Sequence, residues 1–439
     1  MGDWKIEPRQ KQLQSLHTLS RPIEWNLKII AFTLPFQIAG IEAGGYPFSL
    51  TVLALGALNV LLLVRGRFSS RILAALAVFA GWCLVTAAFR HPPGTYLLSW
   101  FGLILVTVPT CAIYPKQVSG EKLLSAIVWG AVASFILATY EVVVAVGVVP
   151  PFEDFLSLSI QPRTQEFLDF RRVKAGMEEP AHYAIYLVLI YAIIDQRQSQ
   201  GASVPWSRRV KLLTPVFLLT TLSLAGVVLF IAYLTVKVLS NLRGVYRVQS
   251  LWRSGLFLLS APIIAVGLIY VVQISGLYEV VALFAARLDV VVDVVIGGTL
   301  TGSEGSRANA IPVMIDYWSS QGWIHFFMGE GYANYSEWLV QEFGYINSVL
   351  SSFARGQINN IFAAIGISTG VVGILLYLWF IKSIFSRPNI YLPASFIATW
   401  LVMHFASGML IGVLPWATLL AACIIFRKIP DRDRLSETT

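Results

Sequence analysis

The chain has 439 residues, of which 56% are hydrophobic and 13% are charged, and its formal net charge is +8. Soluble domains carry about 25% charged residues, so this composition excludes a large water-exposed surface and indicates an integral membrane protein. The charges are clustered, which leaves apolar stretches long enough to cross a hydrocarbon layer of about 30 Å. Cys83, Cys111 and Cys423 all lie inside apolar stretches, so disulfide pairing is not expected.

Residues 1–26 are polar and basic and contain no small-residue cleavage site, so we interpret them as a cytoplasmic tail and not as a signal peptide. A polytopic membrane domain is expected over 27–427, followed by a second cytoplasmic tail at 428–439. The apolar stretches predict about twelve membrane-spanning helices. The predicted spans are 27–43, 47–65, 71–89, 97–114, 122–147, 181–195, 212–223, 225–240, 254–275, 358–381, 391–407 and 410–426.

Two pairs of these spans depend on a break in a longer apolar run. Basic residues flank the run 212–239 on both sides, so it is expected to cross the membrane twice, with a break at Ser223–Gly226. The uncharged run 391–426 is too long for one crossing, and Gly408, Gly412 and Pro415 offer a turn. We therefore predict an out-and-back pair of helices in each run.

The distribution of Lys and Arg supports this threading. Most of the 32 basic residues fall in the tails and loops assigned to the cytoplasm, as the positive-inside rule requires. Most of the others lie in two long periplasmic loops, 148–180 and 276–357, where that rule loses force. The net positive charge is therefore a topology signal, and no nucleic-acid partner is expected. The predicted fold is an all-α polytopic protein of a bacterial inner membrane.

The two periplasmic loops are rich in aromatic residues. Loops longer than about 12–15 residues are usually functional or disordered, and this composition favours function. The second loop contains Leu277–Ile296, an apolar stretch interrupted by Glu279, Arg287 and Asp293, which predicts an amphipathic helix at the outer interface. A folded site at the membrane surface is expected, acting on a lipid-linked or bulky polar substrate.

A basic stretch lies directly before the span that starts at 181. Arg171, Arg172 and Lys174 precede Glu179 and Pro180. Pro is suited to the first helical turn, and a carboxylate is stabilised beside the positive end of a helix. One interpretation is a capped helix start with a solvated basic loop. The other is an anion site, because the planar fork of Arg matches phosphate oxygens.

Two further stretches lie in the second periplasmic loop. Arg307 falls in the first turn of a helix predicted to begin near Ser306, where a cation is unfavourable for the helix dipole. We expect another group to hold Arg307, although it can also be a surface charge. Gly329 and Gly331 enclose Glu330 in a tight turn that ends at Tyr332. This turn is either structural or a substrate contact.

Asn359 and Asn360 stand at the start of the span 358–381, where they can cap the helix or contact a substrate. The chain has no phosphate-binding loop of the Gly-x-x-x-x-Gly-Lys-Ser/Thr type. Its five histidines show no metal-ligand spacing with Cys or carboxylates. We therefore expect no cofactor and no metal.

In their order, these stretches resemble the O-antigen polymerase and O-antigen ligase superfamily, over roughly the last two-thirds of the chain. The resemblance is carried by the Arg-rich stretch ending in Glu179-Pro180, the Ser223–Gly226 break, and the large outer loop. That loop runs from Arg307 through the Gly-Glu-Gly turn to Asn359 and Asn360. Ligases have a His where this chain has Asn359, and the Glu-Pro pattern resembles the polymerase branch more closely.

The resemblance implies a GT-C-like glycosyltransferase that uses undecaprenyl-diphosphate-linked oligosaccharides at the periplasmic face, without a metal or a nucleotide sugar. An acceptor hydroxyl attacks the anomeric carbon while the diphosphate leaves, so fixed cations and a base are expected. The expected diphosphate ligands are Arg172 and Arg307, then Arg171 and Lys174. The candidate bases are Glu179, Glu330 and His325. The expected substrate contacts are Asn359, Asn360 and Tyr332.

Three functions stay open at this point. A polymerase is the first prediction, with a chain-length regulator and a flippase as expected partners, and a ligase that acts on lipid A core is the second. The third is a lipid-linked oligosaccharide flippase or another secondary transporter. Such transporters usually contain internal repeats and bind substrates near the bilayer midplane. The sequence shows no repeat between its halves and almost no midplane charges, and its polar residues lie in the outer loops, which favours an enzyme.

Overall fold

The computed structural model describes most of the predicted spans and part of each outer loop. The described residues are 21–37, 40–43, 46–90, 95–114, 118–145, 166–167, 170–171, 173–175, 177, 179–202, 204–221, 223–243, 309–332, 338–340, 342, 358, 360–406 and 412–427. Arg172, Arg307, Asn359 and the stretch 254–296 lie outside this set, so the predictions made for them are not tested by the structure.

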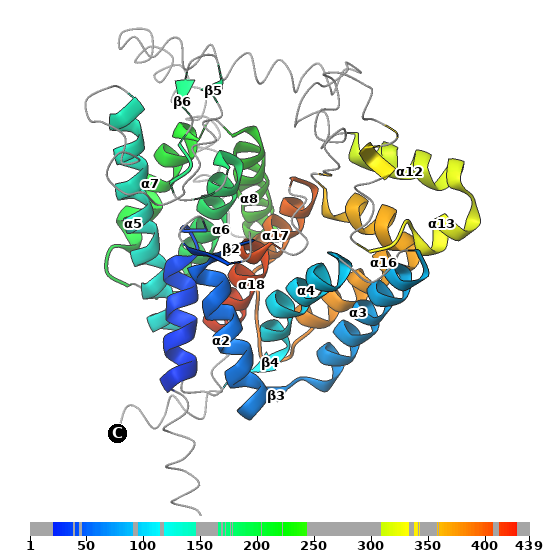
Figure 1. Ribbon diagram of the computed structural model, residues 1–439. Helices are drawn as coiled ribbons and strands as arrows, with labels where there is room; N and C mark the ends of the chain where they lie inside the picture. The colour runs from blue at the N-terminus through cyan, green and yellow to red at the C-terminus, as the bar shows by residue number, and fades with distance from the viewer. Residues whose placement is uncertain are drawn as a thin grey trace, which may run out of the picture.

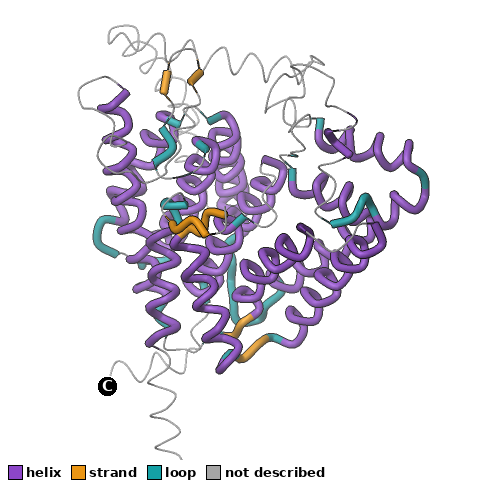
Figure 2. The backbone as a smooth tube through the Cα atoms, in the orientation of Figure 1, coloured by secondary structure: helices purple, strands orange, loops and turns teal. Residues whose placement is uncertain are grey.

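The described chain is mostly helical (Figures 1 and 2). Residues 21–33 form the first helix. The helices that follow are α2 (Leu50–Arg65), α3 (Ser70–Arg90), α4 (Thr95–Cys111), α5 (Gly120–Ala145), α6 (Pro180–Ser199), α7 (Ser207–Thr220), α8 (Leu224–Arg243), α12 (Ala310–Gln321), α13 (Trp323–Met328), α16 (Ile361–Phe385), α17 (Ala394–Ala406) and α18 (Val413–Ile425). The antiparallel strand pairs are β1 (Gly40–Ala43) with β2 (Tyr46–Ser49), β3 (Arg67–Phe68) with β4 (Ala112–Ile113), and β5 (Glu166–Phe167) with β6 (Phe170–Arg171).

Three described helices are long and apolar enough to cross a membrane, namely Ser70–Phe89, Gly120–Val144 and Ile361–Phe385. Shorter apolar helices occur within α2, α4, α8, α17 and α18. Large apolar side chains are also exposed, including Leu63 (77%), Phe89 (76%) and Leu212 (75%). A protein surface of this kind suits contact with lipid tails better than contact with water. The chain is thus a helical membrane protein, whereas the predicted count of about twelve spans is not confirmed.

Both predicted breaks are present. Helix α7 ends at Thr220 and α8 begins at Leu224, and the Oγ of Ser223 accepts a hydrogen bond from the N–H of Gly226 (3.4 Å). The second apolar run divides into α17 and α18, with Gly412 as the residue before α18. The charge pattern and the small residues located these breaks to within a few residues, although Ala225 and Gly226 lie in α8 and Pro415 lies in α18.

The bounds predicted for the first span, 27–43, were wrong at both ends. The first helix occupies 21–33, so it begins inside the predicted tail 1–26 and ends before residue 43. Pro35 explains the early end, because proline lacks an N–H and disfavours helical geometry at the residue before it. The chain then forms the β1–β2 hairpin, with Gly40 opposite Ser49, so the described fold is not purely helical.

Loops that the threading assigned to the same side contact one another. On the predicted cytoplasmic side, β3 pairs with β4, and the guanidinium of Arg427 donates to the carbonyl of Tyr114 (2.7 Å). On the predicted outer side, the N–H of Val173 donates a hydrogen bond to the carbonyl of Thr220 (3.5 Å). These contacts agree with helices that alternate in direction.

Helix α6 lies in the centre of the helical packing and is bounded by a charge cluster at its end. Its residues from Tyr183 to Ile190 are all buried. Near the C-terminal end, the carboxylate of Asp195, which is 2% exposed, pairs with Lys211 of α7 (2.6 Å) and with Lys237 of α8. The Tyr233 hydroxyl also donates to this carboxylate. A buried charge is therefore balanced by cations from two neighbouring helices, as the cost of charge burial requires.

Candidate functional site

Helix α16 is broken at Gly370, whose backbone angles are φ 69° and ψ −173°. A helix that ends at this point leaves its last four carbonyls without partners inside the helix. Each of these four buried carbonyls accepts a hydrogen bond from another part of the chain. The bonds run from Trp318 Nε1 to Gly366 (3.1 Å), from Glu330 N to Ile367 (2.7 Å), from Gly331 N to Ser368 (2.9 Å) and from Trp82 Nε1 to Thr369 (2.9 Å).

The Gly329-Glu330-Gly331 turn fits closely against this break. Gly329 and Gly331 have positive φ angles of 71° and 106°, a region that favours glycine. A Cβ on Gly329 would lie 2.5 Å from the carbonyl oxygen of Ile367, and a Cβ on Gly370 would lie 2.2 Å from that of Phe327. The sequence left open whether this turn is structural or contacts a substrate. Its backbone has a structural role, because it packs against the break in α16. Its effect is to fix Glu330 against a membrane helix.

Glu330 lies in a cluster of polar side chains from α12, α13 and the turn. The Tyr317 hydroxyl donates to its Oε2 (2.8 Å), and Nε2 of His325 is 3.7 Å from the same oxygen. Nδ1 of His325 faces the carbonyl of Gln321 at 2.9 Å. Because a carbonyl only accepts, this contact assigns a proton to Nδ1 and leaves Nε2 directed at Glu330.

This cluster, which we call the Glu330 cluster (Tyr317, His325 and Glu330), is partly open to solvent. The side chains of Glu330 and His325 are 23% and 19% exposed, whereas Tyr317 is buried. Tyr317 packs edge-on against Trp338, with ring centroids 4.6 Å apart. A carboxylate and an imidazole held together at a surface can transfer protons. The structure thus brings together two of the three candidate bases.

Asn360 and Tyr332, the described candidates for substrate contact, form hydrogen bonds within the protein. Asn360 is 2% exposed and caps α16, since its Oδ1 accepts from the N–H of Ala363 (3.0 Å). Tyr332 is 5% exposed, and its hydroxyl donates to the carbonyl of Ser99 on α4 (3.3 Å). Both side chains therefore have a clear structural role. A substrate contact by either residue stays a prediction.

Glu141 and buried apolar side chains hold the segment 173–177, which follows Arg171 and Arg172. Val173, Ala175 and Met177 are buried, and Oε2 of Glu141 accepts from the N–H groups of Lys174 (2.8 Å) and Ala175 (3.0 Å). Ala175 has a φ of 45°, so this carboxylate fixes an uncommon backbone geometry. The segment is anchored by its own apolar side chains and by Glu141.

Sequence reasoning did not assign Glu141 to the site. The available signal was a single carboxylate close to the end of the otherwise apolar predicted span 122–147. Such a group inside or beside a membrane helix usually has a specific partner. Here the partner is the backbone of the basic loop, which no sequence pattern identifies.

Glu179 precedes α6, with Pro180 in the first helical turn as predicted. Its side chain is half-buried and makes no capping hydrogen bond, while its carbonyl accepts from the N–H of His182 (3.1 Å). Arg171 ends strand β6. Figure 1 shows α5, α6 and α7 at the left and α12, α13 and α16 at the right. Glu179 and the Glu330 cluster are therefore on separate groups of helices.

Within the described residues, no three His, Cys, Asp or Glu side chains are grouped so that they could hold a metal ion. No protein-family model matches the sequence, and no curated protein matches it either.

Proposed function

We propose that the chain is a bacterial polysaccharide polymerase, of the O-antigen or exopolysaccharide kind. It transfers a glycan from undecaprenyl diphosphate onto a lipid-linked repeat unit at the periplasmic face of the inner membrane. The observation that carries the proposal is the partly exposed Glu330 cluster, whose backbone turn is hydrogen-bonded to the break in the membrane helix α16. A proton acceptor held at that position suits an acceptor that is itself anchored in the bilayer.

The proposed chemistry is a single displacement. The acceptor hydroxyl forms a bond to the anomeric carbon, the bond from that carbon to the diphosphate oxygen breaks, and undecaprenyl diphosphate leaves with the electron pair. Glu330 takes the hydroxyl proton, with His325 beside it as a second acceptor. In this proposal, Arg172 and Arg307 stabilise the charge that grows on the diphosphate, which lowers the barrier because this charge is greatest in the transition state.

The described helices give less support to transport. Glu141 lies near the end of α5 and binds backbone N–H groups, and Asp195 is already paired with two lysines. Secondary transporters instead bind substrates near the midplane between repeated halves. The solvent-accessible polar cluster of the described outer residues favours surface chemistry.

The decisive experiment gives purified protein only lipid-linked repeat units in detergent. We expect a ladder of longer lipid-linked chains without added ATP or divalent metal, and a chelator should leave it intact. A ligase would instead need lipid A core and would transfer the whole glycan once. A flippase would give no new covalent product, so either of those results would refute the proposal.

The base is tested by replacing Glu330 with Gln, which removes the proton acceptor and keeps the shape of the side chain. The rate of ladder formation should fall about 10²- to 10⁴-fold with little change in KM. Glu121→Gln is the matched control, because Glu121 is exposed at the other end of the molecule, in the first turn of α5. Loss of the ladder in Glu179→Gln, with full activity in Glu330→Gln, would transfer the role to Glu179.

A further inference from the structure

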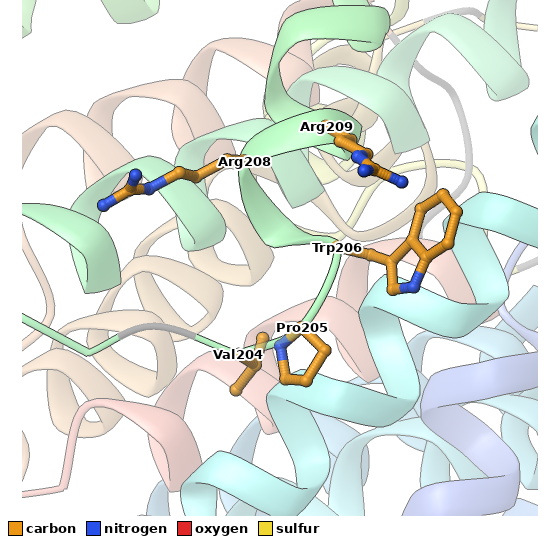
Figure 3. Close-up of a pocket in the computed structure, with 5 residues that line it drawn as sticks. All are labelled: Val204, Pro205, Trp206, Arg208 and Arg209. Carbon is orange, nitrogen blue, oxygen red and sulfur yellow. The ribbon is translucent and has the colours of Figure 1, made fainter.

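A surface cavity of about 590 Å³ lies beside the loop that joins α6 to α7. Cavities of about 300–1,000 Å³ are of the size that holds small molecules. Its lining residues are Val204, Pro205, Trp206, Arg208 and Arg209. Figure 3 shows the guanidinium of Arg209 close to the Trp206 ring, whereas Arg208 extends to the opposite side. The guanidinium carbon of Arg209 is 4.5 Å from the ring centroid.

The positive charge at this cavity is not balanced by nearby acids. Arg208 and Arg209 are exposed in the first turn of α7, which contains no acidic residue. Cations are unfavourable there because the N-terminus of a helix already carries partial positive charge. The Asp195 carboxylate already forms ion pairs with Lys211 of α7 and Lys237 of α8. Among the described residues, neither arginine pairs with a carboxylate, so the cavity is matched to an anion.

Apolar surface continues from the cavity along α7. Leu212, Leu213 and Val216 follow the arginines by one to two turns and are 75%, 44% and 55% exposed. Trp206 and Trp129 of α5 are both nearly half exposed, and their rings are 6.1 Å apart. Tryptophan is enriched where a membrane protein meets the bilayer surface. Trp206, the two arginines and an outward apolar face thus follow one another along α7, with Trp129 of α5 beside Trp206.

We propose that this cavity binds the headgroup of an anionic phospholipid, with its acyl chains against the exposed apolar face of α7. The two guanidiniums extend to opposite sides, which suits a broad phosphodiester headgroup better than a compact free phosphate ion. Since the loop 196–211 is predicted to be cytoplasmic, the lipid belongs to the inner leaflet. The inference is independent of the proposed glycosyltransferase activity.

The test is native mass spectrometry of the full-length protein in detergent. The protein is titrated with phosphatidylglycerol or with phosphatidylcholine of the same acyl chains. Phosphatidylglycerol should bind selectively, and the double variant Arg208→Gln/Arg209→Gln should weaken its binding by about 25-fold, since each basic residue near an anionic surface contributes roughly fivefold. Arg208→Lys/Arg209→Lys should retain most of the binding, because it keeps both charges.

The matched control is the double variant Arg67→Gln/Arg71→Gln. It removes two exposed arginines, from β3 and from the first turn of α3, at another end predicted to be cytoplasmic, and neither lines the cavity. Phosphatidylglycerol binding should be unchanged in this control. Equal binding of the two lipids, an equal loss in the control, or no loss in the Gln pair would overturn the proposal. Displacement of the lipid by excess inorganic phosphate would also overturn it in favour of a free-phosphate site.

Discussion

Glu141 should determine how firmly the segment after Arg171 and Arg172 is held. Its carboxylate makes two hydrogen bonds, to the N–H groups of Lys174 and Ala175. Replacing Glu141 with Ala removes both acceptors and leaves two amides without partners beside the buried side chains of Val173 and Met177. The segment then loses its only hydrogen bonds to a side chain among the described contacts, while the apolar contacts stay.

The expected loss of local stability in Glu141→Ala follows from the two hydrogen bonds that it removes. Hydrogen bonds to a charged group contribute about 1.5–3 kcal/mol each. Because both bonds share one half-buried oxygen, we expect about 3 kcal/mol in total, which corresponds to roughly a 100-fold change in the local opening equilibrium. Glu141→Gln keeps a neutral acceptor of similar shape, and neutral hydrogen bonds contribute about 1 kcal/mol. That variant should show about a tenfold change.

The assay is hydrogen exchange of a peptide covering 173–177, measured by mass spectrometry. Exchange should be fastest in Glu141→Ala, intermediate in Glu141→Gln and slowest in the unchanged protein. Glu121→Ala is the control, since it removes an exposed carboxylate from the other end of α5. If Glu141→Ala exchanges within twofold of the unchanged protein, the carboxylate does not anchor this segment.

Two stability predictions follow from the helix packing. Gly370→Ala should lower the Tm, because a residue with a Cβ in this positive-φ region costs about 1–3 kcal/mol and this Cβ would also collide with Phe327. Gly81→Ala, where a Cβ meets nothing within 4 Å, should leave the Tm unchanged or raise it. Asp195→Asn should destabilise the protein by about 3 kcal/mol, because breaking a buried ion pair leaves its cations uncompensated. Adding Lys211→Met to Asp195→Asn should recover part of that loss, and full stability of Asp195→Asn in thermal unfolding would refute the role of the cluster.

The helices were largely predictable from the sequence, because membrane solvation leaves a strong local signal. Long apolar runs must satisfy their backbone hydrogen bonds internally, which requires helices. Small residues and flanking charges then located the breaks after Thr220 and after Ala406. The early end of the first helix was missed because the sequence stays apolar past Pro35. Hydropathy alone does not show that a proline ends the helix.

The candidate site was predictable only in part. The glycines around Glu330 indicated a turn, and that turn exists. Its partners, the carbonyls of Ile367 and Ser368, lie more than thirty positions further along the chain and carry no sequence signal. Likewise, nothing local indicates that Glu141 binds the backbone at Lys174. Contacts between distant backbone groups depend on how the helices pack, and residue type does not determine them.

The break in α16 has a consequence for how the site can move. Trp318, Glu330 and Gly331 supply three of the four donors to the carbonyls at the break. Separating this unit from α16 would leave three buried carbonyls unpaired, at a cost of about 1–3 kcal/mol each. The Glu330 cluster should therefore move with α16 as one body and keep a fixed depth relative to the bilayer. In the proposed reaction the acceptor is lipid-anchored and would also keep a fixed depth, so its hydroxyl could meet the carboxylate without a search along the membrane normal. Any motion that admits or releases the proposed substrate would then come from segments that do not bond to this break.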